Sequence, residues 1–442
     1  MNKFSKTVAT SVLGFATLFS SFAPATSFAA ESETSNWTRE DASKIVQNKD
    51  NTAPEINTED LEQIAPEYHI WDTWPLRNKD GSIATLNGYK VIFSLTAPSD
   101  VLPGKRHDIA EIRYFVSKNG KDWKLGGTVF NEEQALGSRQ WAGSAMIEDG
   151  EINFFYTATG RKGEEQLTYE QRLVKASADV DASNKGIDFN NWSDHEVILE
   201  PDGEYYQTME QSKQGDIAYA FRDPWFFEDP KTGEDYILFE GNSGGTPAER
   251  SVEQEHIGSE DFATVDEVPE ESKLFNGNIG IAKAENDDYT EFDIMPPLME
   301  ANSLNQELER PHIVTKGNKY YLFTDTHKNK FAPGITGPDG LYGFVSDSLT
   351  SDYEPLNGSG LVVANPENEP YQTYSWMVMP NGTVISFANF YDLNGLTINE
   401  LGAQSEQYQF DHFGGTLAPS LKLSIHNDET KILKEMDAGV FK

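Results

Sequence analysis

Residues 313–324 read IVTKGNKYYLFT: a short apolar strand, a Lys-Gly turn and a second strand rich in aromatic residues. Runs of β-branched and aromatic residues on either side of a glycine turn are typical of a β-hairpin. The pattern occurs four more times, at residues 88–96, 146–157, 226–240 and 378–388. The aromatic strands follow one another at intervals of 61, 83, 84 and 64 residues, which suits one four-stranded blade with its loops. The repeat predicts an all-β fold, a five-bladed β-propeller, and a two-sheet β-sandwich is the alternative.

The composition of the chain excludes several classes of function. The 442 residues carry a formal net charge of −37, from 35 Lys and Arg against 72 Asp and Glu, and 37% of them are hydrophobic. This hydrophobic fraction supports a large core and excludes a disordered chain. The negative charge repels phosphate, so we expect neither nucleic acid nor an anionic membrane as a partner. Cysteine is absent, which excludes disulfides, a thiol nucleophile and Cys-ligated metals.

The first thirty residues have the features of a secretory signal. Lys3 and Lys6 precede an uncharged apolar run at residues 8–22, and Ser27 and Ala29 suit cleavage before Ala30. We therefore expect a signal peptide over residues 1–29 and a secreted, extracellular protein. Residues 30–65 form a polar arm, with a helix expected over 41–47, that packs loosely on a catalytic propeller over 66–442. So negative a secreted chain suits a salty medium, because salt screens its self-repulsion.

A short polar or aromatic motif precedes each hairpin, where the innermost strand of a blade is expected. Trp141, Asp223, Glu309 and Tyr374 stand 12, 13, 11 and 10 residues before their aromatic strands, and Asp72 stands in a similar motif before the first hairpin. Equivalent offsets place these side chains at similar depth around one axis. The sequence therefore predicts a cluster in which three carboxylates meet aromatic rings.

Carboxylates that converge among aromatic rings indicate glycoside chemistry. One carboxylate attacks the anomeric carbon, and a carboxylic acid protonates the leaving oxygen. We expect crowding by like charges to raise the pKa of the acid. Taken singly, Asp223 and Glu309 have ordinary explanations as turn or surface residues, and Trp71 as a core residue. Their joint placement before the hairpins favours a sugar-processing pocket, shaped as a central funnel.

Six motifs in this chain resemble those of the bacterial levansucrase/inulosucrase family of fructosyltransferases, glycoside hydrolase family 68. They are WDTWPL at 71–76, WAGSA at 141–145, FRDP at 221–224, ELERP at 307–311, YYLFTDTH at 320–327 and QTYSW at 372–376. The resemblance covers the chain from about residue 65 onward. It implies a five-bladed propeller and a retaining, two-step transfer of fructose from sucrose.

The resemblance also implies roles for individual residues. Asp72 matches the nucleophile that forms the fructosyl-enzyme, Asp223 the transition-state stabiliser and Glu309 the general acid/base. The other positions implied to bind or surround the substrate are Trp71, Trp141, Ala142, Arg222, Glu240, Glu307, Arg310, His327 and Tyr374.

The chain departs from the family pattern at three places. Ala142 stands where many relatives carry Ser, and His327 where some carry Arg. We expect His327 as a neutral imidazole at the rim of the pocket, where it holds an acceptor sugar less tightly than Arg. For the calcium site of the family, Leu274 and Asn276 fit, and Asp216 lies near an expected carboxylate. Gln306 replaces an acidic ligand, so a structural calcium stays undecided and no cofactor is required.

The sequence thus predicts a secreted, monomeric enzyme of the levansucrase type. Its substrates are sucrose and fructan or oligosaccharide acceptors, with water as a competing acceptor. An inulosucrase that forms β-2,1 linkages and a hydrolytic invertase or fructanase are alternatives on the same fold. A non-catalytic sugar-binding propeller is a third alternative, although such a protein has no need of three converging carboxylates.

Overall fold

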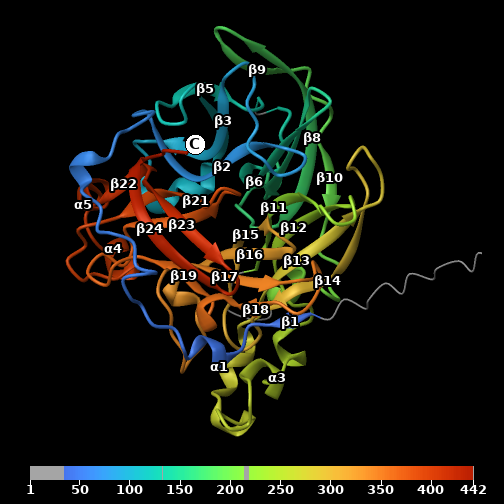
Figure 1. Ribbon diagram of the computed structural model, residues 1–442, viewed down its shortest axis with the longest axis vertical. Helices are drawn as coiled ribbons and strands as arrows, with labels where there is room; N and C mark the ends of the chain where they lie inside the picture. The colour runs from blue at the N-terminus through green and yellow to red at the C-terminus, as the bar shows by residue number, and fades with distance from the viewer. Residues whose placement is uncertain (1–33, 132, 214–218, 442) are drawn as a thin grey trace, which may run out of the picture. The chain divides into compact units, whose positions relative to one another are not determined.

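The computed structural model describes residues 34–131, 133–213 and 219–441, and this part of the chain is built mainly of β-strands (Figure 1). The predicted signal peptide and Asp216 lie outside the described residues. The strands fall into four hydrogen-bonded sheets. No helix in the described part is long and apolar enough to cross a membrane. The prediction of an all-β fold is confirmed.

Five antiparallel runs of strands follow one another along the chain, each beginning with an inner strand. The first run is β2 (Tyr68–Asn78), β3 (Lys90–Pro98), β4 (Glu111–Ser117) and β5 (Lys124–Thr128). The second is β6 (Arg139–Glu148), β7 (Glu151–Thr159), β8 (Gln171–Ser183), β9 (Gly186–Asn190) and β10 (Glu196–Leu199). The third is β11 (Phe221–Glu228), β12 (Asp235–Asn242), β13 (Gly277–Ala284) and β14 (Phe292–Glu300), to which β1 (Ser35–Asn36) adds in parallel.

The fourth run is β15 (Glu309–Lys316), β16 (Lys319–Thr326), β17 (Gly340–Ser346), β18 (Glu354–Pro355) and β19 (Leu361–Ala364). The fifth is β20 (Thr373–Val378), β21 (Thr383–Phe390), β22 (Phe413–Leu417), β23 (Pro419–His426) and β24 (Glu429–Ala438). In the described part of the chain, five short α-helices lie between strands: α1 (Arg39–Ala42), α2 (Met209–Ser212), α3 (Gln254–Ile257), α4 (Ile398–Gly402) and α5 (Glu406–Asp411).

The inner strands form a ring. β2 contacts β6, β6 contacts β11, β11 contacts β15, β15 contacts β20, and β20 contacts β2. A parallel pairing of β2 with β6 joins the first two runs into one nine-stranded sheet. Four sheets around such a ring exclude the two-sheet sandwich. Because the strands form four hydrogen-bonded sheets and not five, the presence of five blades stays a prediction.

Turn residues expected from the sequence join the inner strands to their neighbours. Gly150, Gly233, Gly317 and Gly382 all have positive φ, between 63° and 90°. Each lies between an inner strand and the aromatic strand that follows it, so glycine supplies a conformation that side chains with a Cβ rarely adopt. Aromatic rings of the strands fill the core. Phe93 of β3 and Phe154 of β7 pack edge to face with centroids 4.9 Å apart.

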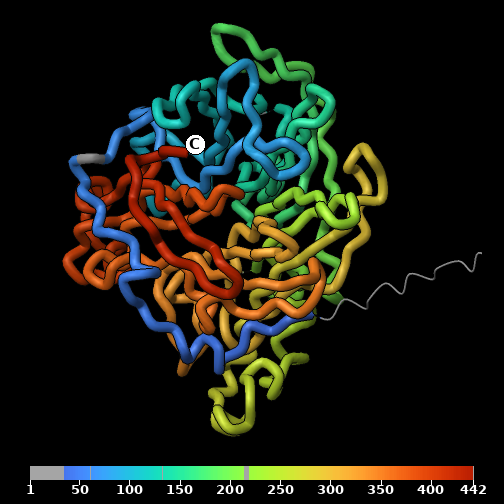
Figure 2. Tube along the Cα trace, in the orientation of Figure 1, coloured from blue at the N-terminus to red at the C-terminus, as the bar shows by residue number. Residues whose placement is uncertain are grey.

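The N-terminal arm packs tightly on the sheets, so the prediction of loose packing is wrong. Trp37 is 1% exposed, and its indole N–H donates to the Ser359 carbonyl at 3.1 Å. The predicted helix over 41–47 is also wrong, because α1 ends at Ala42. Figure 2 shows the arm as the blue tube that runs beside the red C-terminal strands. The boundary predicted at residues 65 and 66 stays a prediction.

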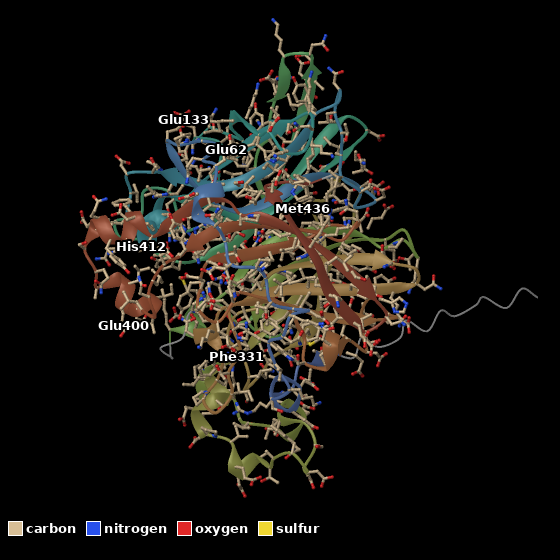
Figure 3. All side chains as sticks on the ribbon, turned by 60° about the vertical axis from the view of Figure 1, so that its left-hand side comes forward. Glu62, Glu133, Phe331, Glu400, His412 and Met436 are labelled. Atoms are coloured by element: carbon tan, nitrogen blue, oxygen red, sulfur yellow. The ribbon has the colours of Figure 1, made fainter. Side chains whose placement is uncertain are left out.

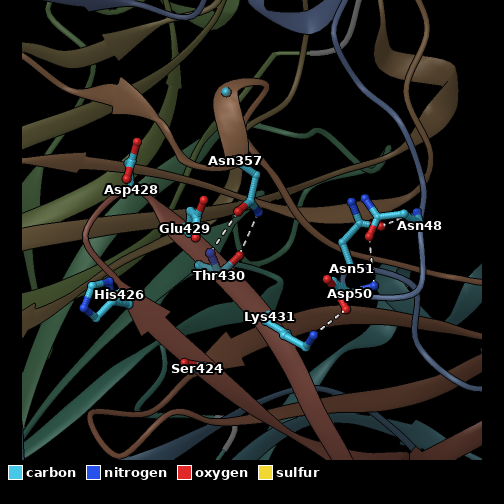
Figure 4. Close-up of a pocket in the computed structure, with 11 residues that line it drawn as sticks. Asn48, Asp50, Asn51, Asn357, Ser424, His426, Asp428, Glu429, Thr430 and Lys431 are labelled. Carbon is cyan, nitrogen blue, oxygen red and sulfur yellow. Dashed lines mark hydrogen bonds and ion pairs between the residues drawn. The ribbon is translucent and has the colours of Figure 1, made fainter.

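A surface cavity of about 490 Å³ lies where the arm meets β24 (Figure 4). Asp50 of the arm pairs with Lys431 at 2.8 Å, and the Asn357 amide donates to the Thr430 hydroxyl at 2.8 Å. The backbone N–H of Ile432 donates to the Asp50 carbonyl at 2.8 Å. The two contacts of Asp50 fasten the arm to the last strand.

Candidate active site

A β-bulge at the same level in each inner strand positions the predicted site residues. The register shifts after Trp71 in β2, Trp141 in β6, Arg222 in β11, Glu309 in β15 and Tyr374 in β20. In four of the strands the next residue is left-handed: φ is 46° at Asp72, 62° at Asp223, 50° at Arg310 and 61° at Ser375. Bulges re-aim side chains, and repeated strain of this kind is typical of functional sites.

The bulges also correct the equivalence drawn from sequence offsets. Asp223 shares its position with Asp72, Arg310 and Ser375, whereas Glu309 shares its position with Arg222 and Tyr374. The sequence offsets instead place Asp223 in the same position as Glu309. The nucleophile and stabiliser candidates therefore occupy one position of the bulge, and the acid/base candidate occupies the other.

Arg222 joins three of the predicted carboxylates. Its Nε lies 2.8 Å from Glu240 Oε2, and its Nη2 lies 3.0 Å from Glu309 Oε1 and 4.0 Å from Glu307 Oε1. Glu240 is directly opposite Arg222 in the β11–β12 ladder and is fully buried. Lys330 pairs with Glu307 at 2.5 Å. Charge-assisted bonds of this kind fix the guanidinium plane against Glu309.

Arg310 holds the bulges of neighbouring strands together. Its backbone N–H donates to Asp223 Oδ2 at 3.2 Å, and its Nη2 donates to the Thr73 carbonyl at 2.9 Å. Its Nη1 donates to both the hydroxyl and the carbonyl of Ser375. The Ser375 hydroxyl in turn hydrogen-bonds to Asp72. One buried arginine thus connects the strands that carry both aspartates.

Glu309 is held by a tyrosine and faces a histidine. The Tyr374 hydroxyl donates to Glu309 Oε2, and His327 Nε2 lies 3.8 Å from the same oxygen. The rings of His327 and Tyr374 stack with centroids 3.7 Å apart. His327 Nδ1 lies 2.8 Å from Asp339 Oδ2, which orients the imidazole. His327 and Glu309 thus lie at the same end of the β15–β16 hairpin.

Aromatic rings form the wall on the β2 and β6 side. Trp71 is completely buried. The His107 ring lies edge-on to it with centroids 5.3 Å apart, and Arg106 Cζ lies 5.3 Å from the centroid of the Trp71 ring. Trp141 is half-buried, and its indole N–H donates to the His107 carbonyl at 3.0 Å. Ala142 is buried, and its carbonyl accepts a bond from Thr157.

The aspartates and Glu240 have raised pKa values. Burial is the main cause at each, and neighbouring carboxylates add to it. The pKa of Asp223 rises to about 7, and that of Glu240 rises well above its ordinary range, although Arg222 opposes both shifts. Arg310 opposes the shift at Asp72. Asp223 and Glu240 therefore hold protons more readily than ordinary carboxyl groups do.

Two expectations about protonation are wrong. Burial raises the pKa of Glu309, but Arg222, His327 and Tyr374 outweigh burial and bring this pKa below its ordinary value. Burial lowers the pKa of His327, but Asp339 and Glu309 outweigh burial and raise this pKa to about 8. Glu309 is thus ionised and His327 is charged at neutral pH. The sequence does not reveal these charge states, because the cations and the carboxylates come close together only in the folded protein.

Four residues of this cluster are not predicted from the sequence. Asp325 is fully buried opposite Glu309 in the β15–β16 ladder, and burial raises its pKa well above the ordinary range. It lies in the FTDTH stretch. The pairing of the two strands of this hairpin places it opposite Glu309, and this pairing was the sequence signal for Asp325. Asp339, Arg106 and His107 lie outside the hairpin pattern, and no sequence signal identified them.

Two of the three residues proposed for calcium, Leu274 and Asn276, belong to the described part of the chain, and calcium binding stays undecided. The Asn276 amide donates to the Ser243 carbonyl at 2.9 Å, and its backbone N–H donates to Gln306 Oε1 at 3.2 Å. Leu274 ends a short 3-10 turn at Glu270–Leu274. The described residues contain no group of three or more His, Cys, Asp or Glu able to hold a metal ion, whereas calcium takes six or more oxygens. Asp216 lies outside the described residues.

An all-β architecture with carboxylates and aromatic rings gathered at a ring of inner strands is characteristic of glycoside-processing enzymes. A family profile described as Levansucrase/Invertase, glycoside hydrolase family 68, matches residues 26–441. Since this match spans almost the whole chain, the protein belongs to that family.

Individual relatives agree with the family assignment. A levansucrase of Rahnella aquatilis is 37% identical over 91% of this chain and 95% of its own. An extracellular sucrase of Zymomonas mobilis is 34% identical over 92% of this chain and 94% of its own. The structure of an inulosucrase from Halalkalicoccus jeotgali bound to kestose is similar with a TM-score of 0.84 and 48% identity, covering 92% of this chain and 97% of that chain. The predicted resemblance to the levansucrase/inulosucrase family is confirmed.

Proposed function

We propose that this protein is a fructosyltransferase that cleaves sucrose and transfers the fructosyl group to a growing fructan, to sucrose or to water. The observation that carries the proposal is the convergence of Asp72, Asp223 and Glu309 on bulged inner strands, linked through Arg222 and Arg310. Membership of family 68 and relatives that include levansucrases and an inulosucrase support it.

In the first step, the Asp72 carboxylate attacks the anomeric carbon of the fructosyl group. The bond from that carbon to the glycosidic oxygen breaks as Glu309 gives its proton to this oxygen, and glucose leaves. Asp223 accepts hydrogen bonds from the fructosyl hydroxyls, and its position is fixed by the backbone N–H of Arg310. The ester between Asp72 and fructose is the product of this step.

In the second step, the Glu309 carboxylate takes a proton from the acceptor hydroxyl. The acceptor oxygen attacks the anomeric carbon, the ester to Asp72 breaks, and both carboxyl groups return to their starting states. Two displacements at one carbon retain its configuration. The low pKa of Glu309 in the free protein suits this step, because the base must be ionised.

The first step requires a proton on Glu309, and the cluster provides sources for it. Asp223 and Glu240 have raised pKa values, and Arg222 is shared between Glu240 and Glu309. Sugar hydroxyls that take up the hydrogen bonds of Arg222 and Tyr374 remove two groups that stabilise the Glu309 carboxylate. Substrate binding then raises the pKa of Glu309 toward the value that a general acid needs.

Product linkage, secretion and oligomeric state are further parts of the proposal. The family includes enzymes named for different products, so an inulosucrase with β-2,1 linkages and a hydrolytic invertase are the alternatives. Residues 1–29 act as a signal peptide for secretion, as the name of the Zymomonas relative supports. The mature protein acts as a monomer, with residues 66–442 as its catalytic domain. A sugar-binding protein without catalysis is the least supported candidate.

Incubation with sucrose tests the proposal, with free glucose and free fructose measured over time. Glucose in excess of fructose supports transfer, and equal amounts support the hydrolytic alternative. Absence of glucose release would refute both enzymatic candidates and favour sugar binding. NMR of the product then assigns β-2,6 or β-2,1 linkages.

A further inference from the structure

A small cavity of about 110 Å³ lies at the end of the inner strands opposite to the catalytic cluster. Later residues of β2, β11, β15 and β20 line it, whereas the bulges that carry the site residues begin in the first half of each strand. These inner strands are labelled around the centre of Figure 1. A cavity needs roughly 10–15 Å³ to hold one water molecule, so this one has room for a small ion with its waters.

Arg77, near the end of β2, is a buried cation in the wall of this cavity. It is 3% exposed, and its Nη1 lies 3.9 Å from the position that a Cβ would take at Gly81, which lines the same cavity. Within the described residues, its one hydrogen bond goes from Nη2 to the Phe226 carbonyl at 2.7 Å, and its Nε has no partner. Burial lowers the pKa of Arg77 to about 9, so the guanidinium is still charged at neutral pH.

Arg77 lacks the anionic partners that the buried arginine of the catalytic cluster has. Glu240 and Glu309 raise the pKa of Arg222, whereas no carboxylate of the described chain acts in this way on Arg77. The Arg77 guanidinium lies over the Trp225 ring, with Cζ 3.5 Å from the ring centroid, which offsets part of the cost of burying the charge. Side chains fill the space between the sheets and keep this cation away from bulk water (Figure 3). A cation buried in this way normally has an anionic partner, because its desolvation is otherwise strongly unfavourable.

Trp225 contributes a second unpaired donor to the same wall. It is 4% exposed, and its Nε1 has no hydrogen-bond partner among the residues that the structure describes. Buried donors are normally paired with an acceptor or with ordered water. A guanidinium and an indole N–H are donors only, so both call for a ligand that accepts hydrogen bonds, and the charge of Arg77 favours a negative one.

Two carboxylates in the cavity wall restrict the kind of anion that fits. Asp80 is exposed and accepts hydrogen bonds from the backbone N–H and the hydroxyl of Ser82. Glu228 is half-buried, and the cation that acts on it is Lys79. Both carboxylates repel a multivalent anion more strongly than a monovalent one. The small volume and these charges together favour a monovalent ion of the size of a halide.

We propose that this cavity binds one small monovalent anion, chloride in a saline medium, with Arg77 as its cationic partner and Trp225 as a further donor. The anion balances the buried charge of Arg77 where the inner strands end, and it thereby stabilises the ring that these strands form. This effect is specific to an anion that fits the cavity. It is distinct from the general screening of the negative surface charge, which any salt provides.

The line width of the chloride NMR signal tests the site in solution. Chloride replaces the bulky anion gluconate at constant sodium concentration and ionic strength, so that general screening does not change. Arg77→Gln is expected to weaken chloride binding by about 10-fold or more, because it removes a charged hydrogen-bond donor. Arg172→Gln is the matched control and is expected to bind chloride as the wild-type protein does. Arg172 is also buried with an unpaired Nε, and its Nη2 donates to the Gly160 carbonyl at 2.6 Å, outside the cavity.

Crystals of the wild-type protein grown in sodium bromide decide the question even if Arg77→Gln does not fold. The expected result is an anomalous peak of bromide in the cavity, within hydrogen-bonding distance of the Arg77 guanidinium. A cavity that holds only water in these crystals would overturn the proposal. The same conclusion would follow if the wild-type protein did not broaden the chloride signal, or if Arg77→Gln bound chloride as tightly as Arg172→Gln.

Discussion

Replacing Tyr374 by Phe removes one hydrogen bond from Glu309 and leaves the ring that stacks on His327. The Tyr374 hydroxyl donates to Glu309 Oε2, and this bond is one of the causes that lower the pKa of Glu309. The bond stabilises the carboxylate and not the protonated acid. Its loss therefore raises the pKa of Glu309.

The size of the shift follows from the burial of the pair. Tyr374 is buried, and the side chain of Glu309 is 19% exposed, so solvent screens the bond only weakly. A hydrogen bond to a charged group contributes about 1.5–3 kcal/mol, and one pKa unit corresponds to about 1.36 kcal/mol. We expect Tyr374→Phe to raise the pKa of Glu309 by about 1–2 units.

The pH dependence of kcat/KM for sucrose measures this shift. The first step needs protonated Glu309, so kcat/KM falls as the pH rises through the pKa of Glu309. The midpoint of this fall is expected about 1–2 units higher in Tyr374→Phe than in the wild-type protein. Glu309→Gln is expected to lack this fall, because it has no proton to lose there.

Tyr206→Phe is the matched control. Tyr206 is fully buried, and its hydroxyl donates to the Met295 carbonyl at 2.6 Å, with no contact to Glu309. This variant loses a buried hydroxyl and keeps the wild-type midpoint. A midpoint in Tyr374→Phe that stays at the wild-type pH or moves down would refute the assignment of Glu309 as an acid tuned by Tyr374.

Three further predictions concern the acid, the histidine and salt. Glu309→Gln should slow sucrose cleavage by about 10²–10⁴ and hurt a substrate with a better leaving group less; equal losses on both substrates would indicate a structural role. His327, with a pKa of about 8, carries a charge that is lost as the pH rises past this value. His327→Ala should raise hydrolysis relative to transfer, and His327→Arg should lengthen the products; unchanged glucose-to-fructose ratios and lengths in both would remove His327 from the acceptor site. With a net charge of −37, the protein should gain melting temperature between low salt and about 1 M NaCl, and a constant or falling value would contradict adaptation to salt.

Much of the fold could be predicted from local sequence, because each hairpin depends on residues close together in the chain. The glycines at 150, 233, 317 and 382 set the turns, and the runs on either side set the strands. The packing of the N-terminal arm cannot be predicted in this way, because it depends on distant partners. Trp37, for example, is buried by rings that follow it by about three hundred residues.

The residues of the site could be found from the sequence, but their electrostatics could not. Asp72, Asp223 and Glu309 stood out because each lies in a motif before a hairpin. The charge state of Glu309 depends on Arg222 from another strand and on the stacked pair His327 and Tyr374. Such contacts exist only after the inner strands close into a ring, so the acid expected to have a raised pKa has a lowered one.

The central claim is that fructose passes through an ester with Asp72. Mass spectrometry of protein quenched in acid during turnover of sucrose tests it directly. The account predicts that the peptide containing Asp72 gains the mass of one fructosyl group, and that Asp72→Asn keeps its fold but shows neither this adduct nor glucose release. An adduct on another residue, or glucose release by Asp72→Asn at more than a few per cent of the wild-type rate, would contradict the account.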